Sequence, residues 1–213
     1  SKGNVINPDD VIKEYGADTL RLYEMFVGDF EKAAPWSTSS IRGCKRFLDR
    51  IWALQDNLID GDTYRESLVR KMHQTIQKVS NDIETLKFNT AIAAMMELLN
   101  EITATGSINK AEFRTLLILL NPFAPHITEE LYETYCGGIL HEQSWPTYDE
   151  ALCKEDTIEI VVQINGKVRC KMNIAVGAEK DAVLEQALAE PKIAEAVAGK
   201  QLVKQLYVCL LYT

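Results

Sequence analysis

Apolar residues between residue 37 and about residue 135 recur every three or four positions, the spacing of one face of an α-helix. Polar residues fill the intervening positions. Three stripes stand out: Ile41, Cys44, Leu48, Ile51 and Leu58; then Leu68, Met72, Ile76, Val79, Ile83 and Leu86; then Phe88, Ile92, Met95, Leu99 and Ile102. About four or five helices joined by short loops predict a mainly α protein built on an antiparallel helical bundle.

Residues ahead of these stripes carry signals for two short helices. Asn7-Pro8 predicts an N-cap with proline at the first helical position, and Gly16 predicts that helix's end. We expect Asp18 to cap a second helix, which Gly28 closes. Residues 29–37 then form a connector.

The end of the helical region contains residues that start and interrupt helices. Asn109 and Glu112 have the spacing of a capping box, which predicts the start of a helix. Pro122 and Pro125 should interrupt the chain before a last helix, which we expect from about Thr128.

The periodicity falls to two after Gly137-Gly138 and the Trp145-Pro146 region. Residues 157–164 and 167–174 alternate, with Asn165-Gly166 between them, and this predicts a β-hairpin. Two alanine-rich helices follow, the second opened by Pro191, and residues 202–208 are predicted to return as a strand. The chain therefore ends in a small α+β domain.

Two registers are open to this hairpin. A two-residue turn would pair Ile164 with Lys167 and set an apolar face beside a basic one. A three-residue loop ending at Gly166 pairs Gln163 with Lys167 and Val161 with Arg169. We predict the second register, because it gathers one apolar face: Ile158, Ile160, Val162, Val168, Cys170 and Met172.

Composition bounds the class of protein. The 213 residues are 46% hydrophobic and 25% charged, as in globular proteins of one or two domains. The longest aliphatic run, 116–120, is too short to span a bilayer. Five scattered cysteines without C-x-x-C spacing suggest free thiols, and no metal site is expected: Cys44, Cys136, Cys153, Cys170 and Cys209. His73, His126 and His141 stand alone, which favours structural roles.

The net charge of −8 is unevenly distributed. Residues 154–213 contain equal numbers of acidic and basic residues, so residues 1–153 carry the whole excess. Binding to a polyanion therefore depends on local patches. No nucleophile–base pair or phosphate-binding glycine loop is visible, and Glu129-Glu130 is expected to be solvated or to lie near a helix N-terminus.

Two basic groups remain as candidates. One is Arg42, Lys45, Arg46 and Arg50; positions 42, 46 and 50 fall nearly in line on a helix, roughly 6 Å apart, as contacts along a phosphate backbone require. The other is Lys167, Arg169 and Lys171, which the predicted register places together on the hairpin's exposed face. The alternative for each group is an ordinary solvated surface.

Four segments resemble class I aminoacyl-tRNA synthetases. SKGNVINPDDVIKEYGADTLRLYEMF resembles the stretch through and beyond the KMSKS loop, with Ser1 as that loop's final serine. PWSTSSIRGCKRFLDRIWAL and LNPFAPHITEELYE resemble the first and last helices of the anticodon-binding domain. WPTYDEAL with VVQINGKVRCKM resembles the C-terminal domain of bacterial-type leucyl-tRNA synthetases.

This resemblance implies an organisation and a function. Residues 1–32 would form a linker region, 33–150 a helical anticodon-binding-type domain, and 151–213 a small α+β tRNA-binding domain. The parent enzyme would ligate leucine to tRNA(Leu) with ATP and Mg²⁺ in the cytoplasm. This fragment, without catalytic lysines or cofactors of its own, would bind tRNA as a monomer joined to an upstream catalytic domain, with no membrane contact.

One departure from the family pattern and two alternative interpretations stay open. The last residues, 209–213, lack the basic residue and the Asn that the family has near its terminus, so the resemblance implies no tRNA contact there. The same region of an isoleucyl- or valyl-tRNA synthetase is an alternative. A non-enzymatic helical interaction module is another, and it requires both basic groups to be merely solvated.

Overall fold

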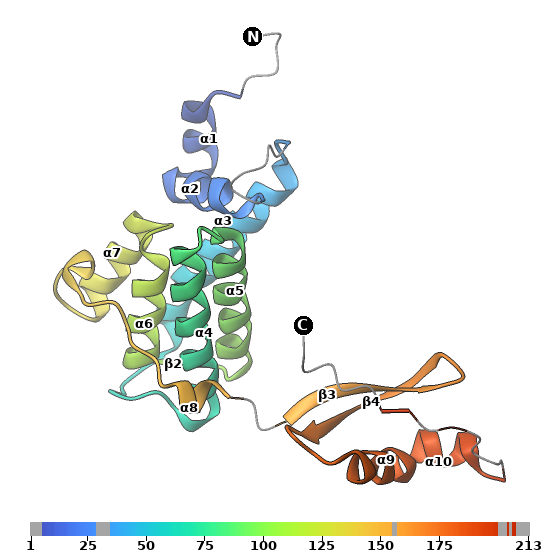
Figure 1. The fold of residues 1–213 in the computed structure, drawn as a ribbon. Helices are drawn as coiled ribbons and strands as arrows, with labels where there is room; N and C mark the ends of the chain where they lie inside the picture. Colours follow the sequence, from blue (N-terminus) through green and yellow to red (C-terminus); the bar gives the residue numbers. More distant parts are fainter. Residues whose placement is uncertain (1–5, 29–34, 155–156, 200–203, 205, 208–213) are drawn as a thin grey trace. The chain divides into compact units, whose positions relative to one another are not determined.

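The computed structural model describes residues 6–28, 35–154, 157–199, 204, 206 and 207. Its contacts divide the chain into two compact units, Ser1–Cys153 and Lys154–Thr213. Figure 1 shows helices in the first unit and a hairpin with two helices in the second. The described residues are mainly helical, as the periodicity predicts.

Two short helices open the first unit. They are α1 (Pro8–Tyr15) and α2 (Ala17–Phe26). The predicted start of α1 is confirmed, because the Asn7 side chain accepts from the Asp9 amide and Gly16 ends the helix with φ 92°. The N-cap predicted for α2 is wrong, because Gly16 precedes the helix without a side-chain cap. The helix ends at Phe26 with Val27 as its C-cap, so Gly28 follows directly, close to the predicted end.

The bundle follows, and Figure 1 shows its long helices side by side. Its helices are α3 (Thr38–Ala53), α4 (Glu66–Glu84), α5 (Phe88–Ala104), α6 (Lys110–Leu120) and α7 (Pro125–Tyr135). Shorter pieces are η1 (Leu54–Asn57), η2 (Leu140–Glu142) and α8 (Glu150–Cys153). Strands β1 (Leu58–Ile59) and β2 (Ile108–Asn109) pair in parallel, so the region is not helical throughout.

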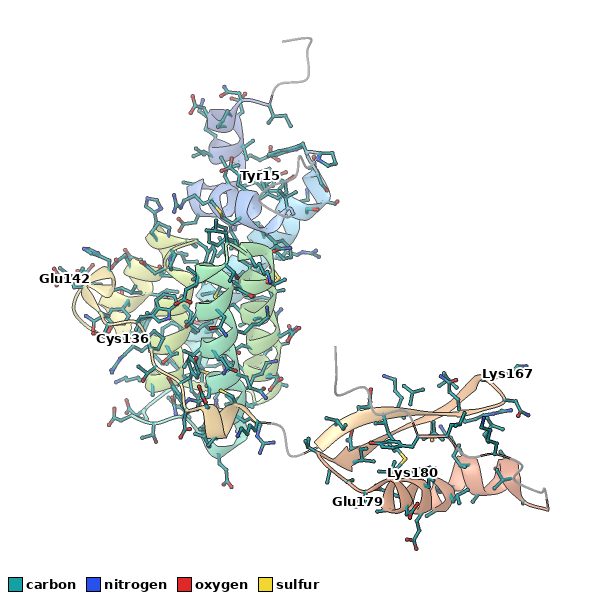
Figure 2. All side chains as sticks on the ribbon, in the orientation of Figure 1. Tyr15, Cys136, Glu142, Lys167, Glu179 and Lys180 are labelled. Carbon is teal, nitrogen blue, oxygen red and sulfur yellow. The ribbon has the colours of Figure 1, made fainter. Side chains whose placement is uncertain are left out.

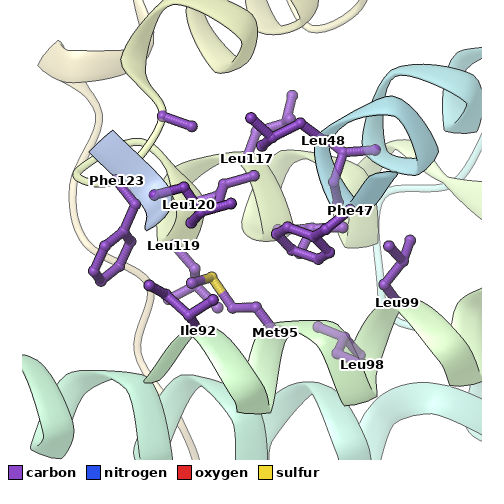
Figure 3. Close-up of a cluster of buried hydrophobic side chains, with 14 of the residues drawn as sticks. Phe47, Leu48, Ile92, Met95, Leu98, Leu99, Leu117, Leu119, Leu120 and Phe123 are labelled. Atoms are coloured by element: carbon purple, nitrogen blue, oxygen red, sulfur yellow. The ribbon is translucent and has the colours of Figure 1, made fainter. Parts of the chain in front are cut away.

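The predicted stripes form the core of this unit. Most of their residues are buried, and Figure 3 shows side chains of α3, α5 and α6 packed together. Leu58 is half-buried beyond the helix, in β1, and Leu86 is 59% exposed. Leu86 leaves the stripe because α4 has already ended and the residue has a positive φ of 57°.

The ends of α6 and α7 follow local chemistry. The predicted capping box is confirmed: the Asn109 side chain accepts from the Glu112 amide, and the Glu112 side chain accepts from the Asn109 amide. Helix α7 begins at Pro125, earlier than the predicted Thr128, because proline's fixed φ suits the first helical position. Thr128 is instead a buried residue whose hydroxyl donates to the Ala124 carbonyl at 2.8 Å.

The second unit contains β3 (Thr157–Ile164), β4 (Lys167–Ala175), α9 (Lys180–Ala189) and α10 (Pro191–Val197). The antiparallel hairpin and the Pro191 helix start are as predicted. A small core gathers Met172, Ile174 and Val183, with Ile158, Ile160 and Val162 packed against it. The strand predicted at 202–208 lies largely outside the described residues.

The predicted hairpin register is wrong. Asn165 and Gly166, with φ 51° and 76°, make a two-residue turn that pairs Ile164 with Lys167. A register shift between Val162 and Gln163 then leaves Arg169 as an extra residue on β4. The bulge lies within the strand and not in the turn, and it restores the apolar pairs: Ile158 with Ile174, Ile160 with Met172, and Val162 with Cys170.

Candidate nucleic-acid interface

Helix α3 presents arginines on the side opposite its buried stripe. Arg42, Arg46 and Arg50 are exposed, while Ile41 and Leu48 face the core. Residues four apart on a helix lie on one flank, with a rise of roughly 6 Å between them. Among the described residues, the side chains of Arg42 and Arg46 have no hydrogen-bond or ion-pair partner. Both guanidiniums therefore keep their donors for an external anion.

The other two cations of this group are engaged within the protein. Lys45 is half-buried and forms an ion pair with Asp49, four residues further along the helix. Arg50 Nη2 donates to the Thr103 hydroxyl of α5 at 3.2 Å, which holds the arginine against the neighbouring helix. The structure therefore brings three arginines onto one flank and places Lys45 beside them with a carboxylate partner.

The hairpin cations do not share one face. Lys167 is opposite Ile164 at the tip, where Figure 2 labels it, and Arg169 is the bulged residue. Lys171 is opposite Val161 and donates to Glu159 at 2.7 Å. All three cations are exposed. Val168, predicted to be on the apolar face, is 60% exposed opposite Gln163, because the bulge follows it.

Each histidine has a partner within the first unit. Asp149 donates its amide to His73 Nδ1 at 3.0 Å, and His126 Nδ1 lies 2.7 Å from Asp18 Oδ1. His141 Nδ1 lies 2.8 Å from Glu129 Oε1. These contacts assign the three rings to structural hydrogen bonds, as expected from their isolation in the sequence.

Glu129 is not simply solvated. It accepts the amides of Leu140 and His141 at 2.9 and 3.0 Å, and so holds the start of η2. Burial alone would raise the pKa of the Glu129 carboxyl, but hydrogen bonds from His141 and Leu140 outweigh it and lower the pKa.

Metal and membrane sites do not emerge from the described residues. No three His, Cys, Asp or Glu side chains in these ranges are arranged to hold a metal ion. None of the helices there has both the length and the apolar composition that a bilayer crossing requires. Four cysteines are free thiols (Cys44, Cys136, Cys153 and Cys170), whereas Cys209 lies outside the described residues.

Sequence reasoning missed two polar contacts between distant elements. Asp18 of α2 accepts the Ile127 amide at the start of α7, 2.7 Å away. Arg65, just before α4, pairs with the buried Glu112 of α6. The capping-box spacing identified Glu112, but no local signal reveals a partner 47 residues away.

The family described as the anticodon-binding domain of tRNA ligase matches residues 66–184, more than half of the chain. The chain belongs to this anticodon-binding domain family. The match begins at the first residue of α4 and runs through the hairpin into α9.

Relatives of this family member are leucine–tRNA ligases. That of Alkaliphilus oremlandii is 52% identical over 209 residues, covering 98% of this chain and 26% of the relative. That of Chlorobaculum parvum is 42% identical, covering 98% of this chain and 27% of the relative. The chain thus spans about a quarter of the length of these relatives.

A solved structure is similar along nearly the whole chain. It is the leucyl-tRNA synthetase of Agrobacterium radiobacter K84 in a ternary complex with tRNA and LeuAMS. The TM-score is 0.74 at 31% identity, covering 98% of this chain and 30% of the synthetase. The chain is therefore similar to this synthetase in fold as well as in sequence.

Proposed function

We propose that this chain is the tRNA-holding, C-terminal part of a leucine–tRNA ligase and that it binds tRNA(Leu). The observation that carries the proposal is the row of exposed arginines on α3, two of them without a partner among the residues that the structure describes, in a member of the anticodon-binding domain family. Guanidiniums spaced along one helix flank suit the repeated phosphates of an RNA backbone. The hairpin cations Lys167, Arg169 and Lys171 supply a second set of phosphate contacts.

The proposed chemistry of the whole enzyme is ligation of leucine to tRNA with ATP and Mg²⁺. We assign neither Mg²⁺ nor a reaction step to this chain; among its described residues, no three His, Cys, Asp or Glu side chains are grouped as in a metal site. We expect no leucine-dependent exchange between ATP and pyrophosphate from this chain alone. Leucine, rather than isoleucine or valine, is supported by the leucine–tRNA ligases among its relatives. A cytoplasmic location and a monomeric state complete the proposal.

Salt dependence of tRNA binding tests this function. Each phosphate contact contributes about 0.7 to 0.9 to the slope of log affinity against log salt concentration. Changing Arg42 and Arg46 to glutamine should reduce the slope by about 1.5 and weaken binding at least tenfold at 0.1 M salt. Filter binding of tRNA(Leu) at several salt concentrations measures both quantities.

A matched control has the same change in net charge. The substitutions K13Q and K87Q also remove two exposed cations, one on α1 and one just before α5. This variant should keep the parent slope within about 0.5. Equal losses in both variants would indicate non-specific charge attraction, and unchanged affinity in the arginine variant would favour a protein-interaction module.

A further inference from the structure

Two side chains of α2 contact both ends of the turn between α6 and α7. Asp18 accepts the Ile127 amide at 2.7 Å through Oδ2, and its Oδ1 lies 2.7 Å from His126 Nδ1. Arg21 Nη2 donates to the Pro122 carbonyl at 3.0 Å. These partners lie 101 to 109 residues apart in sequence, so the contacts join the opening segment to the end of the bundle.

Helix α7 depends on Asp18 for its cap. Its own N-cap residue is Ala124, which offers no side-chain acceptor, although the first amides of a helix need one. Asp18 is only 9% exposed and supplies a carboxylate there, where negative charge is favourable. A carboxylate from α2 therefore completes α7, and this contact requires one particular placement of α2.

Apolar contacts alone would not specify that placement. Leu22 and Tyr23 of α2 are buried and attach the helix to the bundle, and the Tyr23 hydroxyl accepts the Ser37 amide just before α3 at 2.9 Å. Burial is non-directional, so it tolerates sliding or rotation of a short helix. The hydrogen bonds of Asp18 and Arg21 need defined distances and angles, and they point at two ends of one turn.

We propose that Asp18 and Arg21 form a clamp that sets the orientation of α1–α2 on the bundle, and that both are positioning residues. Figure 1 shows α1 and α2 at one end of the bundle, ahead of α3. A functional role for the clamp follows, and it rests on the proposed function: the clamp determines how tRNA held by the bundle is presented to the rest of the enzyme. Neither residue is assigned any contact with tRNA.

Hydrogen exchange in this chain tests the clamp itself. In D18A, amides of the first turn of α7 and of α1–α2 should exchange about tenfold faster, while those of α4 and α5 stay within about twofold. H126A should have a smaller effect, because the bond between Asp18 and the Ile127 amide remains. D18N, which keeps one acceptor oxygen, should restore part of the protection. E24Q, at an exposed site on α2, serves as the control.

Two exchange results would overturn the clamp. Faster exchange confined to α7 would make Asp18 a local cap that does not hold α1–α2. Faster exchange everywhere, including α4 and α5, would mean general destabilisation.

Kinetics of the complete ligase that contains this chain test whether the clamp affects how tRNA is presented to the rest of the enzyme. With D18A, kcat for leucine transfer to tRNA should fall at least about fivefold, with leucyl-adenylate formation and the KM for tRNA within about twofold of the parent. An equal loss of adenylate formation, or no loss of transfer, would overturn it. If the unaltered chain fails to bind tRNA, the proposed function fails, and the exchange result still decides the clamp.

Discussion

Arg65 Nη2 lies 2.8 Å from Glu112 Oε2, which joins the start of α4 to the first turn of α6. Glu112 is fully buried and also accepts the Arg65 and Asn109 amides at 2.9 and 3.1 Å. Arg65 donates further to the Ser107 carbonyl at 2.8 Å. One ion pair thus connects α4, α6 and the segment before β2, and its polar atoms are well satisfied.

Glu112 should make stability depend on acid pH. Burial alone would raise the pKa of its carboxyl, but hydrogen bonds from Arg65 and Asn109 outweigh burial and lower the pKa from its ordinary value. A group whose pKa is lower in the folded state stabilises the fold above its unfolded pKa. That stability is lost as the pH falls through the folded pKa. E112Q should lower the free energy of unfolding by about 3 kcal/mol at pH 7.

Urea unfolding at pH 7, 5 and 4 measures this dependence. The parent should lose more stability than E112Q between pH 5 and 4, because the variant no longer has this titration. E66Q, at an exposed site in the first turn of α4, should behave as the parent. Equal pH slopes for E112Q and the parent would contradict the assignment.

Leu86 is a site where glycine should stabilise the protein. It follows α4 with φ 57°, and the Lys87 amide donates to the Asp82 carbonyl at 2.7 Å, the pattern of a Schellman motif. A left-handed conformation costs a residue with a Cβ about 1 kcal/mol, so L86G should raise the free energy of unfolding by about that amount. L86A removes the same exposed side chain without relieving φ, and it should show no such gain. Thermal melts of both variants compare them.

Replacing the glycine of the hairpin turn should destabilise the hairpin, the reverse of the gain expected for L86G. Gly166 has φ 76°, and a Cβ there would meet no atom within 4 Å, so the cost of G166A is conformational. We expect about 1 kcal/mol of lost hairpin stability, seen as faster amide exchange in 157–175. N165G should retain or increase protection, because Asn165 also has a positive φ of 51°. Protection lost in N165G and kept in G166A would exclude this turn.

Cys44 should be the least reactive of the described thiols. It is fully buried in α3, and burial raises the pKa of its thiol to about 11. The thiolate is the reactive form, so little of it exists at pH 8. Iodoacetamide at pH 8, followed by peptide mass spectrometry, should label Cys170 in the native chain and Cys44 only after denaturation. Rapid native labelling of Cys44 would mean that α3 opens readily.

The helices and their core faces could be predicted from the sequence because those signals are local. Stripes at a spacing of three to four residues identified the buried faces of α3, α4 and α5, and capping residues located the starts of α1 and α6. The prediction that Leu86 is buried is wrong, because the apolar spacing of the stripe continues beyond Glu84, where α4 ends. The arginines of α3 were found in the same way, since a buried stripe leaves the opposite flank exposed.

The remaining features depend on partners that are distant along the chain. Asp18 has the local signature of a cap for α2, yet it caps α7, because packing brings an uncapped helix end within hydrogen-bond distance. The alternating pattern of the hairpin requires its apolar residues to share a face. A bulge within the strand and a longer loop both meet that requirement, so the pattern alone does not choose between them. Periodicity by itself therefore determined which residues form helices and which faces are buried. Only the tertiary structure decided which polar side chains meet, because hydrogen bonds depend on distance in space and not on separation in sequence.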